Sequence, residues 1–253
     1  MRYDTGVATV DVIVPVYNEK RALPKTIPLL RDFLSGPSFP YEWRIVIADN
    51  ASIDDTPRVG KEVAGGSGGK VEYVRIERKG RGFALKQTWL ASPMDVVSYM
   101  DVDLSTGLDA FPALIGAIAH DGFDVAVGSR LAAQSRITRS LKRRVLTRGY
   151  NTLIRALFQT RFSDAQCGFK AVSRQAAQRI VPVIEDNNWF FDTELLILAE
   201  KMGYRVKDVP VEWVEDTDTR VKIAATVWED LRGLLRLRAG QPWRRQKGAG
   251  RSS

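Results

Sequence analysis

The sequence predicts an α/β fold with a mainly parallel sheet and helices on both of its faces, and three observations support this prediction. Short apolar segments rich in Val and Ile recur through the first half of the chain. Segments with apolar residues at helical spacing separate them, and polar or acidic residues follow the apolar runs directly. Strands of a parallel sheet are buried on both faces and need crossover helices, so this alternation is typical of a Rossmann-like sheet.

The first half of the chain contains five expected strands with helices between them. Each expected strand is a short apolar run that ends at polar or turn-forming residues. The strands are expected at Val10–Val14, Arg44–Ala48, Val71–Ile76, Val96–Met100 and Val125–Val127. The helices are expected at Ala22–Leu34 (with Pro28 inside it), from after Ser52 to about Ala64, at Gly82–Ala91, and after Thr106 through Ile118.

The second half is less regular and is expected to form a smaller C-terminal subregion. Its expected elements are a basic helix at Thr138–Phe158, a strand at Gly168–Val172, a helix capped by Ser173, a helix at Asp192–Met202, an extended segment at Arg205–Val211 and a last helix at Val221–Leu237. We therefore expect a single domain over residues 1–238, with halves at 1–130 and 131–238, and a flexible basic tail over 239–253.

The composition excludes several classes of protein. The chain has 253 residues, of which 44% are hydrophobic and 27% charged, as in ordinary globular proteins. Its single cysteine, Cys167, excludes a disulfide framework, and its single histidine, His120, excludes a histidine-based metal cage. No apolar run approaches the roughly 20 residues of a membrane-spanning helix, and Asp11 and Glu19 interrupt the N-terminal apolar stretch. We therefore expect a cytoplasmic protein that is not secreted.

The net charge of +8 is unevenly distributed along the chain. Eleven Lys and Arg residues lie between Arg130 and Arg174, against one acidic residue, Asp164, and seven more follow from Arg232 onward with no acidic residue. Such an asymmetry indicates an anionic partner, either phosphates, nucleic acid or an anionic membrane surface, unless it marks two solvated helices. We do not expect nucleic-acid binding, because it would leave the acidic loops after the strands unexplained.

Asp101 and Asp103 carry the clearest chemical signal, because they directly follow a strand that is expected to be buried. Ligands of parallel sheets bind at the carboxyl ends of the strands. Oxygen ligands without His or Cys suit Mg²⁺ or Mn²⁺, which bridges substrate phosphates. A D-x-D pair also occurs in solvated loops, and its place after a core strand favours the metal. Glycine-rich signatures of dinucleotide-binding and P-loop proteins are missing, which argues against both classes.

Eight short motifs occur in an order that resembles a known family. The first five are V-P-V-Y-N-E at Val14–Glu19, D-N-A-S at Asp49–Ser52, G-R-G at Gly80–Gly82, D-V-D at Asp101–Asp103 and G-S-R at Gly128–Arg130. Together they resemble the inverting family 2 glycosyltransferases of GT-A fold. The others, at Asp164–Lys170, Trp189–Leu196 and Val209–Trp213, resemble polyprenyl-phosphate sugar synthases, dolichyl-phosphate glucosyltransferases most closely and dolichyl-phosphate mannose synthases next. The resemblance covers about residues 10 to 238.

The resemblance implies transfer of a hexose from a nucleotide-diphosphate sugar, UDP-glucose being favoured, to a polyprenyl or dolichyl phosphate. A GDP-mannose donor, or a catalytically silent sugar-nucleotide-binding membrane adaptor, is the alternative. The resemblance also implies that the first half binds the nucleotide. Asp101 and Asp103 would then hold Mg²⁺ or Mn²⁺ at the diphosphate, with Asp103 nearer the metal. The implied donor-binding residues are Pro15, Tyr17, Glu19, Ile47, Asp49, Gly80, Gly82, Asp101, Val102, Arg130 and Arg220.

The second half is then expected to face the acceptor and the membrane. Asp192 matches the position of the catalytic base in relatives that glycosylate hydroxyl groups. A phosphate monoester acceptor has a second pKa of about 6 and is already ionised at pH 7, so it needs no strong base. We therefore expect Asp192 to position neighbouring groups or to cap its helix. Asp164 is expected to orient basic residues, and Arg136, Arg139 and Lys170 to contact the acceptor phosphate. The catalytic candidates are Asp103, Arg130, Asp164 and Asp192. The helix over 138–158 is expected either to lie on the cytoplasmic face of a membrane or to pack on the core.

Overall fold

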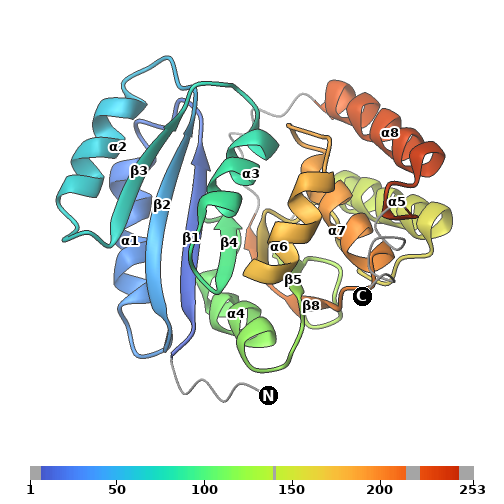
Figure 1. Ribbon diagram of the computed structural model, residues 1–253, viewed down its shortest axis with the longest axis horizontal. Helices are drawn as coiled ribbons and strands as arrows, with labels where there is room; N and C mark the ends of the chain where they lie inside the picture. The colour runs from blue at the N-terminus through green and yellow to red at the C-terminus, as the bar shows by residue number, and fades with distance from the viewer. Residues whose placement is uncertain (1–6, 139–140, 215–222, 245–253) are drawn as a thin grey trace, which may run out of the picture.

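The computed structural model describes residues 7–138, 141–214 and 223–244, and its centre is a seven-stranded sheet (Figure 1). The strand order is β3-β2-β1-β4-β7-β5-β8, and all of these strands run in one direction except β7, which is antiparallel. The strands are β1 (Thr9–Val16), β2 (Glu42–Asn50), β3 (Val71–Ile76), β4 (Val96–Met100), β5 (Val125–Ser129), β7 (Phe169–Ser173) and β8 (Val206–Pro210). The predicted mainly parallel α/β fold is therefore confirmed.

Helices cover both faces of the sheet. The helices are α1 (Leu23–Leu34), α2 (Thr56–Gly65), α3 (Arg81–Ala91), α4 (Phe111–Ala119), α5 (Leu141–Phe158), α6 (Arg174–Ile180), α7 (Phe191–Lys201) and α8 (Ile223–Gly240), with short 3₁₀ turns η1 (Leu108–Ala110) and η2 (Val181–Val183). Helices α1 and α2 lie on one side of β1–β3 and α3 lies on the other (Figure 1). Trp89 of α3 meets Phe191 of α7 edge to face at 5.8 Å, which joins the two halves of the molecule through an aromatic contact.

A second, two-stranded sheet was not predicted. It pairs β6 (Arg136–Thr138) with β9 (Glu212–Val214) in parallel. The sequence predicts that Thr138 begins the basic helix, but this residue ends β6, and the helix begins at Leu141. The predicted N-cap is confirmed, since the Ser173 hydroxyl accepts a hydrogen bond from the Ala176 amide at 3.2 Å. Within the described ranges, no helix combines the length and apolarity needed to cross a membrane.

The topology brings the predicted site segments to one edge of the sheet. Strands β1, β2, β4 and β5 run in the same direction in one sheet, so the loops that follow them share its carboxyl edge. Strand β7 is antiparallel between β4 and β5, and its first residue, Phe169, pairs with Met100. Gly168 therefore lies directly beside the turn that contains Asp101.

Candidate active site

The turn after β4 presents the two aspartates. The Asp103 carboxylate is exposed and accepts a hydrogen bond from the Ser105 amide at 2.9 Å. The Asp101 side chain is 44% exposed and packs against Gly168 so closely that a Cβ there would lie 1.8 Å from Asp101 Oδ2. Gly168 is therefore required for this position of Asp101.

Arg81, to which the sequence analysis assigned no role, joins Asp101 to Asp192. Its Nη2 donates to Asp101 Oδ1 and its Nη1 to Asp192 Oδ2, both at 2.7 Å. The Arg81 side chain is only 9% exposed. Its one sequence signal is its place between the two glycines of the G-R-G motif, because its partners lie 20 and 111 residues further along the chain.

Asp192 is a buried ion-pair centre. Besides Arg81, its carboxylate receives the Lys170 ammonium at 2.8 Å and the Tyr99 hydroxyl. Burial raises the pKa of Asp192, but the positive charges of Lys170 and Arg81 outweigh it and hold the pKa below its usual value. The residue at the cap of α7 is Phe190, so the interpretation of Asp192 as a helix cap is wrong.

Lys170 is not placed to contact the acceptor phosphate directly, which corrects the expectation from its basic surroundings. Its side chain is fully buried in β7. Its ammonium donates to Asp192 at 2.8 Å, to the Cys167 carbonyl at 2.6 Å and to the Tyr99 hydroxyl at 3.2 Å. These three bonds use all the donors of an ammonium group, so Lys170 fixes Asp192 instead.

Arg130 and Asp164 form a second buried pair, at the end of β5. Arg130 Nε and Nη2 donate to the two carboxylate oxygens of Asp164 at 2.7 and 2.9 Å, and the Arg130 amide adds a third bond at 3.1 Å. Burial raises the pKa of Asp164, but Arg130 outweighs it and lowers that pKa below its ordinary value. Asp164 therefore orients one basic residue, Arg130, in a bidentate geometry.

Two residues expected to line the donor pocket are buried in the sheet instead. Ile47 is a core residue of β2. The fully buried Asp49 carboxylate accepts from the Ser52 amide at 2.9 Å, the Tyr73 hydroxyl at 2.5 Å and Arg75 Nη1 at 3.1 Å. Burial and the Asp49 carboxylate together raise the pKa of Tyr73 to about 12. Asp49 thus shapes the loop after β2, and direct contact with a nucleotide is not open to it in this arrangement.

The glycines of the G-R-G motif make room for protein, not for the donor as expected. A Cβ on Gly80 would lie 2.6 Å from the Asn187 carbonyl oxygen, and one on Gly82 would lie 2.7 Å from Phe191 Cβ. Gly80 also has a φ of +149°, which disfavours a side chain. Its amide donates to Asn50 Oδ1 at 2.6 Å, so Asn50 anchors this loop.

The remaining predicted residues are distributed around this edge. Pro15, near the end of β1, and Tyr17 and Glu19, which follow this strand, are partly exposed, and the Lys79 ammonium lies 4.0 Å from the Tyr17 ring centroid. The Val102 carbonyl accepts from the Thr26 hydroxyl at 2.7 Å. Arg136 is 84% exposed and pairs with Glu212 at 3.3 Å. Arg139 and Arg220 lie outside the described residues.

Asp101 and Asp103 fit a hard divalent cation that has few protein ligands. The described part of the chain contains no cluster of three or more His, Cys, Asp or Glu side chains that could enclose a metal. Mg²⁺ and Mn²⁺ are commonly held by one or two carboxylates together with water and substrate phosphates. Cys167 is unsuited to such a site, because burial raises the pKa of its thiol to about 12.

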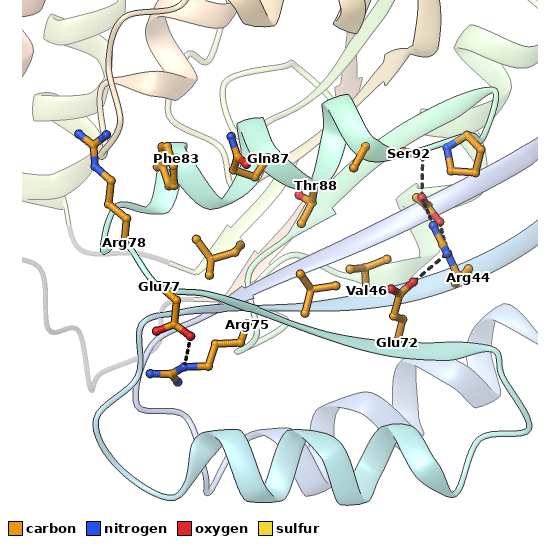
Figure 2. A pocket seen from close by; sticks show the side chains of 15 residues that line it. Arg44, Val46, Glu72, Arg75, Glu77, Arg78, Phe83, Gln87, Thr88 and Ser92 are labelled. Atoms are coloured by element: carbon orange, nitrogen blue, oxygen red, sulfur yellow. Dashed lines mark hydrogen bonds and ion pairs between the residues drawn. The ribbon is translucent and has the colours of Figure 1, made fainter.

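A groove of 590 Å³ lies between α3 and strands β2 and β3 (Figure 2). Figure 2 shows Phe83, Gln87 and Thr88 of α3 above β3, with Arg44 towards one end and Arg75 towards the other. None of the predicted site residues lines it. We therefore place the functional site at the carboxyl edge of the sheet.

A mainly parallel sheet of this topology, with paired aspartates after a central strand, is the architecture of the GT-A glycosyltransferase fold. The chain belongs to glycosyl transferase family 2, because the sequence model of that family matches residues 11–181. It is 34% identical over 222 residues to glycosyltransferase AglD of Haloferax volcanii, a match that covers 86% of this chain and 35% of AglD. It is 31% identical to a dolichyl-phosphate β-glucosyltransferase of Trichomonas vaginalis, covering 85% of this chain and 66% of that one. The chain therefore spans about a third of AglD and about two thirds of the second relative.

Solved structures share the fold. Glucosyl-3-phosphoglycerate synthase of Mycobacterium tuberculosis, in complex with Mn²⁺, UDP and glucosyl-3-phosphoglycerate, superposes with a TM-score of 0.65 at 21% identity, over 92% of this chain and 80% of that one. A mannosyltransferase of Pyrobaculum calidifontis, in complex with GDP-mannose and Mn²⁺, has a TM-score of 0.57 at 20% identity, over 88% of this chain and 61% of that one.

Proposed function

We propose that this protein transfers a hexose from a nucleotide-diphosphate sugar, in the first instance UDP-glucose, to a polyprenyl or dolichyl phosphate with inversion at the anomeric carbon. The observation that carries the proposal is the Asp101–Asp103 turn beside the buried guanidinium groups of Arg81 and Arg130. The relatives named dolichyl-phosphate β-glucosyltransferases, at 27% to 31% identity, support the choice of donor and acceptor.

The reaction requires stabilisation of the leaving nucleoside diphosphate, which gains negative charge as the glycosidic bond breaks. A divalent cation, Mn²⁺ or Mg²⁺, supplies a Lewis acid for these oxygens, and Asp101 and Asp103 would hold it. Arg130 adds a fixed positive charge, because Asp164 holds its guanidinium in one orientation. A side chain fixed before the reaction needs little reorganisation as charge develops.

The acceptor needs little help from a base. A phosphate monoester is mostly ionised at pH 7, since its second pKa is about 6. The lowered pKa of Asp192 and its bonds to Arg81, Lys170 and Tyr99 suit a carboxylate that fixes its neighbours. Arg136, exposed on β6, remains our candidate for contact with the acceptor phosphate.

Transfer is tested by incubating the protein with Mn²⁺ or Mg²⁺, a short polyprenyl phosphate and a panel of UDP-glucose, UDP-N-acetylglucosamine, UDP-N-acetylgalactosamine and GDP-mannose. We expect a glycolipid with UDP-glucose and the β configuration at its anomeric carbon. Formation of glycolipid with none of the donors, by a protein that still binds UDP, would favour the silent adaptor and overturn the proposed transfer.

We also propose that α5 and α8 bring the enzyme to an anionic membrane surface on the cytoplasmic side. One side of α5 packs on the core through Ile154 and Phe158, as one of the two expectations for this helix requires. The other side of α5 exposes apolar side chains among basic ones, which is the composition expected of a helix that lies on a membrane surface. Helix α8 exposes a similar mixture. The exposed apolar side chains are Val145, Leu146, Leu153, Val227, Trp228, Leu231 and Leu235. Exposed arginines on these helices are Arg144, Arg148, Arg155, Arg232 and Arg238.

The double variant L146S/W228S is expected to bind vesicles containing phosphatidylserine at least about tenfold more weakly than the parent, because each apolar side chain contributes roughly 1.5–3 kcal/mol when fully buried. Vesicle flotation measures the binding. Ile53→Ser is the matched control, since Ile53 is 83% exposed but lies after β2. Equal binding by the double variant and the control would contradict the proposed surface.

A further inference from the structure

Arg81 is a charged side chain that is largely buried beside Asp101 of the candidate site. One guanidinium group serves two carboxylates from different elements, Asp101 after β4 and Asp192 in α7, at 2.7 Å each. The same group lies 4.8 Å from the ring centroid of Tyr99 and 5.1 Å from that of Trp189. Two ion pairs and two aromatic faces therefore fix its orientation.

The two carboxylates differ in how they depend on Arg81. Asp192 is almost completely buried and also receives Lys170 and the Tyr99 hydroxyl. Asp101 is much more exposed, and Gly168 lets its carboxylate lie against the protein at the end of β4. A divalent cation that approaches Asp101 therefore competes with Arg81 for the same negative charge, whereas Asp192 keeps its other partners.

We propose that Arg81 is a positioning residue that makes cation binding depend on the donor, an inference that rests on the proposed function. Without donor, Arg81 neutralises Asp101 and weakens its attraction for a cation. The diphosphate of a bound donor offers Arg81 another anion, so that Asp101 becomes available to the cation. The cation and the nucleoside diphosphate should then strengthen each other's binding, since such coupling is reciprocal.

The test is the dissociation constant of Mn²⁺, measured by electron paramagnetic resonance without UDP and with saturating UDP. We expect UDP to tighten Mn²⁺ binding in the parent protein and Arg81→Met to reduce this gain about tenfold, mainly by tightening Mn²⁺ binding in the absence of UDP. Arg78→Met is the matched control: it removes an exposed arginine, stacked on Phe83 at 4.8 Å, from the preceding loop, and should keep the parental gain.

Arg81→Met leaves two carboxylates without this partner, so the fold is checked by circular dichroism. If that variant does not fold, R81M/D192N takes its place, because it removes one cation and one anion together and leaves a side-chain amide whose oxygen can accept from Lys170. A gain from UDP that is unchanged in the folded variant, or a parent without any such gain, would overturn the role of Arg81. The proposed function fails separately, if the parent makes no glycolipid in the donor panel.

Discussion

Replacing Asp103 with Asn is expected to lower the rate of sugar transfer at least about 100-fold, because it removes a negative charge from the candidate cation site at the donor diphosphate. The substitution should not disturb the fold. Asp103 is exposed, and an Asn side chain can accept the same hydrogen bond from the Ser105 amide, at 2.9 Å in the parent. The measurements are initial rates of glycolipid formation and Mn²⁺ affinity in the presence of UDP, both of which should fall.

Asp109→Asn is the matched control for this experiment. Asp109 is an exposed aspartate in η1, six residues beyond Asp103, so the control removes the same charge at a position close to Asp103 in the sequence. We expect its transfer rate to stay within about twofold of the parent, since exposed charges that are not in contact interact weakly in water. Parental rate and Mn²⁺ affinity in Asp103→Asn would contradict the assignment of Asp103 to the metal.

The strands of the first half could be predicted because their signal is local in the sequence. Buried parallel strands are continuous apolar runs, and the five predicted for the first half all occur. The pairing of β6 with β9 could not be predicted in the same way, because three-residue strands have no periodicity to detect. The antiparallel direction of β7 is likewise a tertiary property that its composition does not encode.

The sequence predicted a site at the ends of the strands, but it did not specify the partners of each side chain. Lys170 stands in a basic stretch, which suggested contact with a phosphate, yet β7 carries it into the core and onto Asp192. Asp49 follows the strand expected from the sequence, as a ligand-binding residue would, but in the structure it lies in β2, and Tyr73 and Arg75 of the neighbouring strand donate to its carboxylate. Which residues form ion pairs across long sequence distances is determined only by the tertiary structure.

Two groups of ion pairs explain how this site can hold exposed and buried charges close together. Arg130 with Asp164, and Arg81 with Lys170, Asp192 and Asp101, form groups in which cations and anions balance. Each charge is oriented by its partner, so these side chains have little conformational freedom at the candidate site. Removing one partner of a buried ion pair strongly destabilises the folded protein, because the other charge stays buried without a partner.

Asp164→Ala is accordingly expected to lower the free energy of unfolding by about 3–5 kcal/mol, which is the cost typical of leaving a buried charge without its partner. Arg130 would lose the bonds at 2.7, 2.9 and 3.1 Å that Asp164 accepts from its side chain and amide. Urea unfolding at pH 7 measures the loss. Glu62→Ala is the control: it breaks the exposed pair with Arg58 in α2, at 2.7 Å, and should cost no more than about 0.5 kcal/mol.

The same ion pair predicts how this loss depends on pH. The pKa of Asp164 is lowered in the folded protein from an ordinary value of 3.8, so its ionised form stabilises the fold above that pH. As the pH falls below 3.8 towards the folded-state pKa, the unfolded chain takes up a proton first and this contribution is lost. The difference in unfolding free energy between the parent and Asp164→Ala should therefore narrow below about pH 4. A loss no larger than that of Glu62→Ala, or one constant down to about pH 3, would show that Arg130 does not depend on the Asp164 carboxylate.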